Sequence, residues 1–298
     1  MVNRNEWTPP QLIQWISGEF ESLQLPEPHR LEAELLVSHA LNCSRLELYL
    51  DFDKPTSKEE RNLLRNLVRR RKNREPIAYI LGKWEFYGIS LKLGPGVLIP
   101  RPDTECLVDH ALDLVQKDTR TQPYSILELG TGTAAIPLAI TSNCNNIHIL
   151  TLEKSAEALF WAKENINSNL EKIDKLNNQI HLISGDGFGV LKPNISFEMI
   201  ISNPPYIEQS DLTTLAKEVS CFEPKVALDG GKDGLDFYHL LLSAAKEHLK
   251  PSGYLIFEHG FDQKEKIKRI MAQAADLKYI NGFQDLNSND RVLLFQKI

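Results

Sequence analysis

The residues best suited to chemistry form one tetrapeptide, Asn203-Pro204-Pro205-Tyr206. It follows an apolar run, residues 197–201, that predicts a buried strand. Each proline holds its own φ at about −65° and lacks a backbone N–H, so the segment is rigid and cannot continue the hydrogen bonding of a sheet. The free carbonyls and the Asn203 side chain can then bind a planar polar group, and Tyr206 can pack against it. A proline-rich turn after a strand is the alternative interpretation.

A glycine-rich turn joins a predicted strand to a predicted helix. Its residues are Gly130, Thr131, Gly132, Thr133 and Ala134. Gly130 and Gly132 permit a tight turn and let the backbone approach a ligand closely. Several classes of nucleotide-binding fold share such a turn, so it does not identify the ligand by itself.

Acidic side chains at predicted strand ends narrow the choice of ligand. Glu128 could pair with the α-ammonium group of an amino-acid-bearing cofactor, and it would repel a pyrophosphate. Glu153 ends the second strand, where a carboxylate suits two ribose hydroxyls. A favourable charge at a helix N-terminus is the alternative role for Glu153. After the third strand, Asp186 could accept from an adenine amino group and Phe188 could stack on the ring; a plain turn is the alternative.

Acids at the ends of the first two strands and after the third, with Asn-Pro-Pro-Tyr after the fourth, are typical of class I S-adenosylmethionine-dependent methyltransferases. The combination is more specific than any of its members. The expected acceptor is a nitrogen of an amide or amino group that is conjugated to a π system. Strands and helices alternate, which predicts an α/β, Rossmann-like, mostly parallel sheet with helices on both faces. Strands are expected at residues 126–129, 147–152, 180–184, 197–201, 253–258 and 291–296, and helices at 134–140, 155–169, 238–249 and 263–275.

A length of 298 residues favours two domains. We predict a small all-α N-terminal domain over residues 1–75, a linker with a β-hairpin over 76–102, and a methyltransferase catalytic domain over 103–298. In the first domain, apolar residues recur at helical spacing, and Ser57 with Glu60 forms a capping box that opens its last helix.

That last helix is strongly basic, and its role is open between a solvated face and a contact with an acidic partner surface or RNA. Its basic residues are Arg61, Arg65, Arg69, Arg70, Arg71, Lys72 and Arg74. The net charge of −6 argues against direct nucleic-acid binding. The four cysteines are widely spaced and form no CxxC pair, so free thiols are expected and no metal site. No signal-peptide core or membrane-spanning run is evident, so we expect a cytoplasmic protein without a membrane partner, and a monomer.

With these residues assembled, the chain resembles the release-factor glutamine methyltransferases, the HemK/PrmC family. The resemblance covers nearly the whole length and is carried by residues 74–82, 84–88, 98–105 and 223–235, of which the last two segments are the most discriminating. It implies methyl transfer from S-adenosylmethionine to the side-chain amide nitrogen of glutamine in the Gly-Gly-Gln motif of bacterial peptide chain release factors. It also implies that the helical domain helps to hold the release factor.

Each residue of the tetrapeptide has an expected role in this chemistry. The Asn203 side-chain oxygen and the Pro204 carbonyl accept the two amide N–H groups, Pro205 keeps the turn rigid, and Tyr206 packs against the amide. Asn203 is also expected to border the cofactor. Proton loss can follow transfer, so the mechanism needs no strong general base. Glu105 either lines the pocket or has a structural role in the linker.

The sequence departs from the family at four positions. Ala134 stands where Gly is usual, and Glu128 and Glu153 stand where Asp is common. Gly187 falls where an aromatic residue is common, so the adenine contact is expected to shift to Phe188. The competing functions are a glutamine methyltransferase of a ribosomal protein, a nucleic-acid amino-methyltransferase, a dinucleotide-dependent oxidoreductase and a non-catalytic binding module.

Overall fold

The computed structural model describes residues 7–50, 53–119 and 121–298, and its residue contacts divide the chain into two compact units. The helical unit comprises Met1–Gly82 together with Lys217–Phe222. The sheet unit comprises Lys83–Ala216 and Glu223–Ile298. The chain therefore enters the helical unit twice, which the sequence analysis did not anticipate. The predicted domain boundaries at residues 75 and 102 stay predictions.

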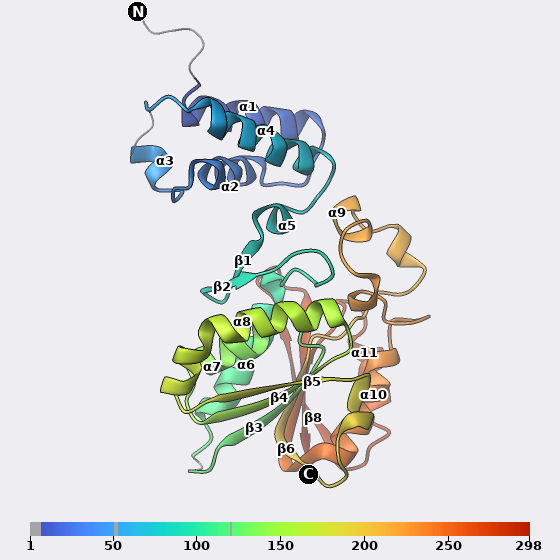
Figure 1. Ribbon diagram of the computed structural model, residues 1–298. Helices are drawn as coiled ribbons and strands as arrows, with labels where there is room; N and C mark the ends of the chain where they lie inside the picture. The colour runs from blue at the N-terminus through green and yellow to red at the C-terminus, as the bar shows by residue number, and fades with distance from the viewer. Residues whose placement is uncertain (1–6, 51–52, 120) are drawn as a thin grey trace, which may run out of the picture. The chain divides into compact units, whose positions relative to one another are not determined.

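The helical unit is built on amphipathic helices whose apolar faces meet. Its helices are α1 (Pro9–Ser22), α2 (His29–Leu41), α3 (Glu47–Leu50), α4 (Lys58–Lys72), α5 (Ile77–Leu81) and α9 (Lys217–Ser220) (Figure 1). On α1, Leu12, Ile16 and Phe20 are buried, as their helical spacing predicts. Helix α5 was not predicted, because a single buried turn is too short to show a helical period.

The basic helix α4 is anchored by the predicted capping box. The Ser57 hydroxyl accepts from the Glu60 backbone N–H at 3.1 Å, and the Glu60 carboxylate accepts from the Ser57 N–H at 2.6 Å. Arg71, at the other end, is only 1 % exposed. It donates to Glu32 at 2.7 Å and to Glu218 of α9 at 3.1 Å. Arg71 therefore belongs to the core of the helical unit, which neither interpretation of the basic run foresaw.

We expect Arg71→Lys to lower the free energy of unfolding by about 1–2 kcal/mol, because one ammonium group cannot reproduce the two bonds to Glu32 together with the bond to Glu218. Arg65→Lys is the matched control, since Arg65 is exposed and donates to the side chain of Asn62 on the same helix. Urea unfolding of the full chain measures both. Equal midpoints for the two variants would contradict the structural role of Arg71.

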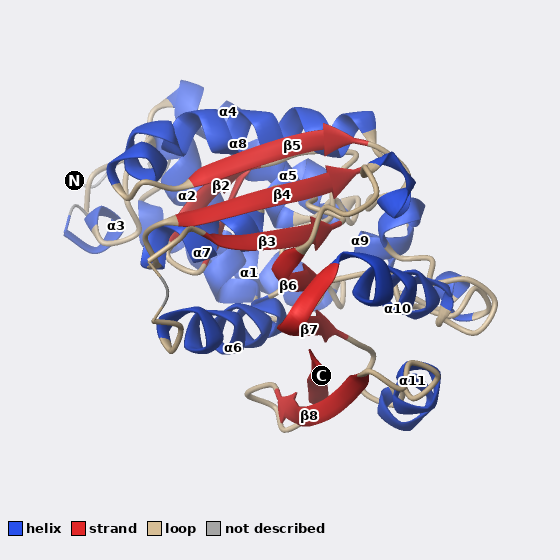
Figure 2. Ribbon diagram, turned by 90° about the horizontal axis from the view of Figure 1, so that it is seen from below, coloured by secondary structure: helices blue, strands red, loops and turns tan. Residues whose placement is uncertain are grey.

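The sheet unit contains a seven-stranded sheet in the order β5-β4-β3-β6-β7-β9-β8 (Figure 2). The strands are β3 (Tyr124–Leu129), β4 (Ile147–Glu153), β5 (Gln179–Ser184), β6 (Phe197–Ser202), β7 (Leu249–Glu258), β8 (Leu277–Gln284) and β9 (Asp290–Lys297). The first five in this order are parallel, and β9 pairs antiparallel with both of its neighbours, β7 and β8. The mostly parallel sheet is confirmed. Strand β8 was missed, because it is half-exposed and a register shift between Tyr279 and Asn281 interrupts its period of two.

Helices cover both faces of this sheet, as Figure 2 shows. One core packs α6 (Glu105–Gln116), α7 (Ala135–Asn143) and α8 (Ala156–Lys175) against Ile126 and its neighbours. The other packs α10 (Asp236–His248) and α11 (Lys264–Met271) against Leu127 and its neighbours. Successive strand residues thus serve opposite cores, which explains the continuous apolar runs in the sequence. Four single-turn helices, η1 (Pro102–Thr104), η2 (Gly187–Val190), η3 (Asp211–Thr213) and η4 (Lys225–Ala227), lie in the connections.

The predicted hairpin is also present, as β1 (Lys83–Phe86) and β2 (Ile89–Lys92). Asn165 of α8 holds it, because its side chain bonds both backbone groups of Lys92, at 2.7 and 2.9 Å. The same amide donates to the Thr133 carbonyl at 3.0 Å. The hairpin and the glycine-rich turn therefore share one buried anchor on α8.

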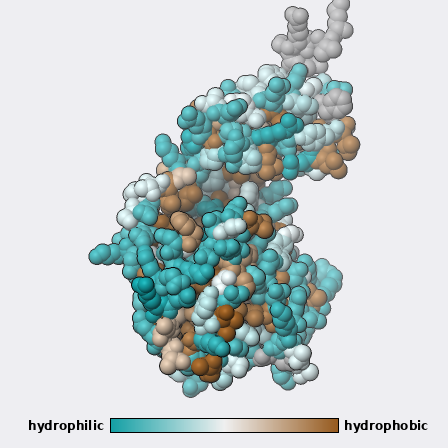
Figure 3. All heavy atoms as spheres, turned by 180° about the vertical axis from the view of Figure 1, so that it is seen from behind, coloured by the Kyte–Doolittle hydropathy of each residue, from teal (hydrophilic) through white to brown (hydrophobic). Residues whose placement is uncertain are grey.

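Polar side chains cover much of the surface in the view of Figure 3, with apolar residues scattered among them. Within the ranges that the structure describes, every helix is too short or too polar to cross a membrane.

Candidate active site

A cleft lies where the carboxyl ends of β3, β4, β5 and β6 meet, as expected for a parallel sheet. Eight of the predicted site residues line it: Gly130, Gly132, Glu153, Asp186, Gly187, Asn203, Pro204 and Pro205. The segment Gly96–Leu98, which precedes η1, also lines it, as do Pro224, Val226 and Ala227. Glu128, Thr131, Thr133 and Ala134 are buried beside these residues. The fold therefore brings together predicted site residues that are up to 75 positions apart in the sequence, from Gly130 to Pro205.

The glycine-rich turn has three residues in the left-handed region. Gly130 has φ of 76°, Gly132 has 56° and Ala134 has 63°. Glycine adopts this region without steric cost, whereas an alanine there is strained by about 1–2 kcal/mol. Ala134 is nevertheless fully buried and caps α7. The departure at this position therefore leaves the turn conformation intact.

Glu128 is 1 % exposed, and its two carboxylate oxygens differ in their surroundings. Oε2 accepts from the Thr151 hydroxyl at 2.6 Å. Oε1 is buried without a hydrogen-bond partner in the part of the chain that the structure describes. Burial raises the pKa of Glu128 to about 7, although the bond from Thr151 lowers it. An unpaired buried acceptor at this strand end fits the ammonium group of an amino-acid-bearing cofactor.

Glu153 organises the backbone around the turn. Its Oε2 accepts from the Gly132 N–H at 3.0 Å, and its Oε1 accepts from the N–H groups of Lys154 and Ser155 at 2.9 and 2.8 Å. These bonds satisfy the helix N-terminus, as the alternative interpretation proposed. A carboxylate has about four lone-pair sites, so Oε2 can still accept from a ribose hydroxyl. The side chain therefore suits both roles.

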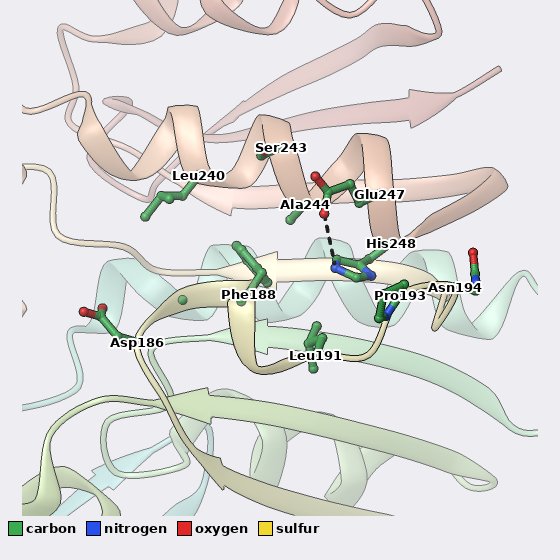
Figure 4. Close-up of a pocket in the computed structure, with 12 residues that line it drawn as sticks. Asp186, Phe188, Leu191, Pro193, Asn194, Leu240, Ser243, Ala244, Glu247 and His248 are labelled. Atoms are coloured by element: carbon green, nitrogen blue, oxygen red, sulfur yellow. Dashed lines mark ion pairs between the residues drawn. The ribbon is translucent and has the colours of Figure 1, made fainter.

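The side chains of the two residues that were expected to bind adenine together point in different directions. Asp186 lines the cleft, and its exposed carboxylate pairs with Lys154 Nζ at 2.7 Å. Asp186 also borders a neighbouring pocket beside α10, which Phe188 lines, and Figure 4 shows the Phe188 ring directed toward that helix. Gly187 has φ of 70° and redirects the chain between the two side chains. A stacking role for Phe188 stays a prediction.

Asn203 is held in one orientation by a neighbouring hydroxyl. Its Nδ2 donates to Thr104 Oγ1 at 2.9 Å, so Oδ1 is the end of the amide that can accept from another group. Tyr206 lies farther along the same turn and is half-buried. Its hydroxyl donates to Glu258 Oε1 at 3.1 Å. Burial and the Glu258 carboxylate raise the pKa of Tyr206, so the phenol is neutral.

The late glycine-rich loop, residues 228–234, supports the backbone of Tyr206. Ile207 exchanges backbone hydrogen bonds with this loop, donating to Leu228 at 3.0 Å and accepting from Gly230 at 2.9 Å. A Cβ at Gly230 would lie 2.8 Å from Tyr206 Cα, so only glycine fits there without movement. Gln263 of the α11 N-terminus donates to the Tyr206 carbonyl at 2.9 Å. The loop therefore acts as a rigid backing for the turn.

We expect Gly230→Ala to lower kcat/KM about tenfold, because the added methyl must push the Tyr206 backbone away from its position. Gly189→Ala is the matched control, since a Cβ there meets no atom within 4 Å. Steady-state methylation kinetics with both variants test this. Equal kcat/KM values for the two would show that the backing is dispensable.

The two most discriminating sequence segments are joined by one buried carboxylate. Glu223 accepts from Arg101 Nη2 at 2.5 Å and from the Ile99 N–H at 3.2 Å. Glu105, from the first of these segments, accepts from the Tyr87 N–H of the hairpin turn at 2.8 Å. Glu105 thus has a structural bond in the linker. Sequence reasoning missed the contributions of Thr104 and Glu258. The signal for Glu258 was an acidic residue at the end of a predicted strand, which Glu153 and, one residue earlier, Glu128 also show.

Comparison with known proteins agrees with this architecture. Residues 11–82 match the model of the PrmC N-terminal domain, and residues 105–222 match that of the methyltransferase small domain. The solved hMettl16 catalytic domain in complex with MAT2A 3'UTR hairpin 6 superposes with a TM-score of 0.53 at 16% identity, covering 70% of this chain and 76% of that one. This last likeness shows the fold alone. The fold and these matches define an S-adenosylmethionine-dependent methyltransferase.

Relatives match the chain over nearly its whole length. The release factor glutamine methyltransferases of Rhodopirellula baltica and Geobacter sulfurreducens are each 37% identical, covering 99% and 96% of this chain and 98% and 96% of their own. That of Buchnera aphidicola subsp. Schizaphis graminum is 38% identical over 95% of this chain and 98% of its own. The chain therefore belongs to the family of release factor glutamine methyltransferases, which confirms the resemblance found in the sequence.

Proposed function

We propose that this protein uses S-adenosylmethionine to methylate the side-chain amide nitrogen of glutamine in the Gly-Gly-Gln motif of bacterial peptide chain release factors. The observation that carries the proposal is the Asn203 amide, whose Nδ2 is committed to Thr104 while the residue lines the cleft. The names of the full-length relatives support a release factor as the substrate.

The rigid turn meets the main chemical difficulty, which is that an amide nitrogen is a poor nucleophile. The Asn203 Oδ1 and the Pro204 carbonyl accept the two N–H bonds of the glutamine amide, which orients the nitrogen and favours the positive charge that develops on it. Two prolines hold these acceptors in place. Tyr206 packs against the amide, and Pro205 closes the cleft beside it. Proton loss follows transfer, so no general base is needed.

The cofactor supplies the electrophilic methyl group of its sulfonium. Glu128 Oε1 receives the ammonium group, and Glu153 Oε2 receives the ribose hydroxyls. Gly130, Thr131, Gly132, Thr133 and Ala134 let the backbone approach the cofactor. Asp186 accepts from the adenine amino group beside Gly187, and Phe188 reaches the ring if its side chain turns back from the neighbouring pocket.

We further propose that the helical unit helps to hold the release factor. We also propose that the protein is a monomeric enzyme of the cytoplasm and does not bind nucleic acid directly. A ribosomal protein or nucleic acid is the competing substrate. The Gly-Gly-Gln target and the competing substrates are open to one direct experiment.

The test incubates the full chain with methyl-labelled S-adenosylmethionine and purified release factor. A release factor with the Gly-Gly-Gln glutamine replaced by alanine is the control, and ribosomal proteins and RNA are parallel substrates. We expect label on the unmodified release factor alone. Label that persists after the glutamine is replaced, or that appears only on ribosomal protein or RNA, would overturn the proposed acceptor.

A further inference from the structure

Glu258 is a buried carboxylate beside the tetrapeptide 203–206. The methyl-transfer chemistry proposed above assigns it no role. It ends β7 and is 1 % exposed. Its two carboxylate oxygens accept from different hydroxyls: Oε2 accepts from Thr104 at 2.6 Å, and Oε1 accepts from Tyr206 at 3.1 Å. One carboxylate therefore bonds directly to the tetrapeptide and to the hydroxyl that holds Asn203.

The direction of these hydrogen bonds decides how the Asn203 amide faces. A threonine hydroxyl has one proton, and Thr104 donates it to Glu258. Its oxygen is then an acceptor toward Asn203, which must present Nδ2 at 2.9 Å. Oδ1 is consequently the end available to a substrate amide. An ionised carboxylate enforces this order because it can only accept.

We propose that Glu258 is a positioning residue that sets the amide orientation of Asn203 through Thr104 and the ring position of Tyr206 through a direct hydrogen bond. It acts through its neighbours and does not touch the substrate. This inference rests on the proposed function for its kinetic consequence, but the orientation of Asn203 is a property of the substrate-free protein.

The side chain of Glu258 changes its charge close to neutral pH. Burial raises its pKa to about 7, against the bonds from Thr104 and Tyr206 and the attraction of Arg291, which lower it. A protonated Glu258 carries one O–H donor, so it can no longer accept from both Thr104 and Tyr206. The active form is therefore the ionised one, populated above pH 7. The other titratable groups that act on this cluster are Asp103, Cys106, Tyr238 and Asp285, the last paired with Arg291 at 3.0 Å.

Two variants test the relay in the full chain. Glu258→Gln offers one acceptor and one donor, so it cannot accept from both hydroxyls, and Thr104→Val removes the link to Asn203 with little change of shape. Each is expected to lower kcat at least tenfold, with KM for the release factor and cofactor affinity within about twofold of wild type. Thr104→Ser restores the hydroxyl and should rescue kcat. At saturating cofactor, wild-type kcat should rise as pH increases through 7, and this rise should be absent in Glu258→Gln.

Glu198→Gln is the matched control, because Glu198 is also a buried glutamate of this sheet but accepts from Ser125 and Lys250 near the start of β6. It should lower the unfolding midpoint and leave kcat unchanged. Wild-type kcat in both Glu258→Gln and Thr104→Val would overturn the proposal.

A spectroscopic readout separates this proposal from the proposed function. The Asn203 side-chain NH₂ resonances of the substrate-free protein should shift in Glu258→Gln and in Thr104→Val, and should return in Thr104→Ser. Unchanged resonances would overturn the positioning role even if release factors are methylated. Shifted resonances in a protein that methylates no release factor would uphold the positioning role and refute the acceptor.

Discussion

Asn203→Ala is expected to lower kcat/KM for the release factor by about 100- to 1000-fold, the range seen when one preorganised hydrogen-bonding group is removed from a site of developing charge. The variant loses the Oδ1 acceptor and also the bond from Nδ2 to Thr104. The glutamine amide then keeps only the Pro204 carbonyl to orient it. Methylation kinetics with saturating cofactor measure the loss.

Asn143→Ala is the control for this variant. Asn143 ends α7, beside the starts of β3 and β4, and its Nδ2 donates to the Ala139 carbonyl of the same helix at 2.8 Å. It should retain wild-type kcat/KM. Asn203 also borders the cofactor cleft, so cofactor affinity of Asn203→Ala is to be measured separately and should change only a few-fold. A rate within threefold of wild type would rule out the proposed role.

Glu128→Gln is expected to weaken S-adenosylmethionine binding by about 10- to 100-fold, which corresponds to the loss of one charge-assisted hydrogen bond of about 1.5–3 kcal/mol. The shape of the side chain is kept and only its charge is removed. Isothermal titration calorimetry on the full chain measures the affinity directly. An affinity equal to that of wild type would show that the ammonium group does not bind there.

The raised pKa of Glu128 adds a second expectation. Its folded pKa of about 7 lies above the unfolded value of 4.5, so the cofactor-free native state binds more protons than the unfolded state between these values. This group therefore lowers stability as pH rises from 4.5 to 7, by a total on the order of 3 kcal/mol. The cofactor ammonium favours the ionised carboxylate, so binding at pH 6.5 should release a proton.

Proton release is measured by calorimetry in two buffers of different ionisation enthalpy. Glu128→Gln should abolish it, and the cofactor-free variant should be more stable than wild type at pH 8. Glu258→Gln is the control, because Glu258 has a similarly raised pKa but bonds to Thr104 and Tyr206. It should keep the proton release. If proton release were lost in Glu258→Gln but kept in Glu128→Gln, the released proton would come from Glu258 and not from Glu128.

The main strands of the sheet unit could be predicted from the sequence because their hydrophobic pattern is local. The runs 126–129 and 197–201 are apolar at every or nearly every position, which is typical of strands covered on both faces. Strand β8 carries no such run, since it lies at the sheet edge and packs against only one neighbour, β9. Its pairing depends on contacts that no short window of sequence contains.

Within the candidate site, the polar groups at the strand ends could be predicted from the sequence. Parallel strands bring their carboxyl ends to one edge, so Glu153, Asp186 and Asn203 line one cleft although they are far apart in the chain. The rigidity of the turn could also be predicted, because Pro204 and Pro205 restrict the backbone wherever they occur.

The orientation of these groups and the contacts that support them depend on residues that are distant in the sequence. The orientation of the Asn203 side-chain amide depends on Thr104 and Glu258, which lie 99 and 55 positions away in the sequence. Phe188 packs toward α10 although its spacing suited the adenine. Arg71 of the basic helix is buried against Glu218 of α9, 147 positions later. The physical reason is common to all three: a side chain takes its orientation from burial and hydrogen-bond partners, which come together only when distant segments fold.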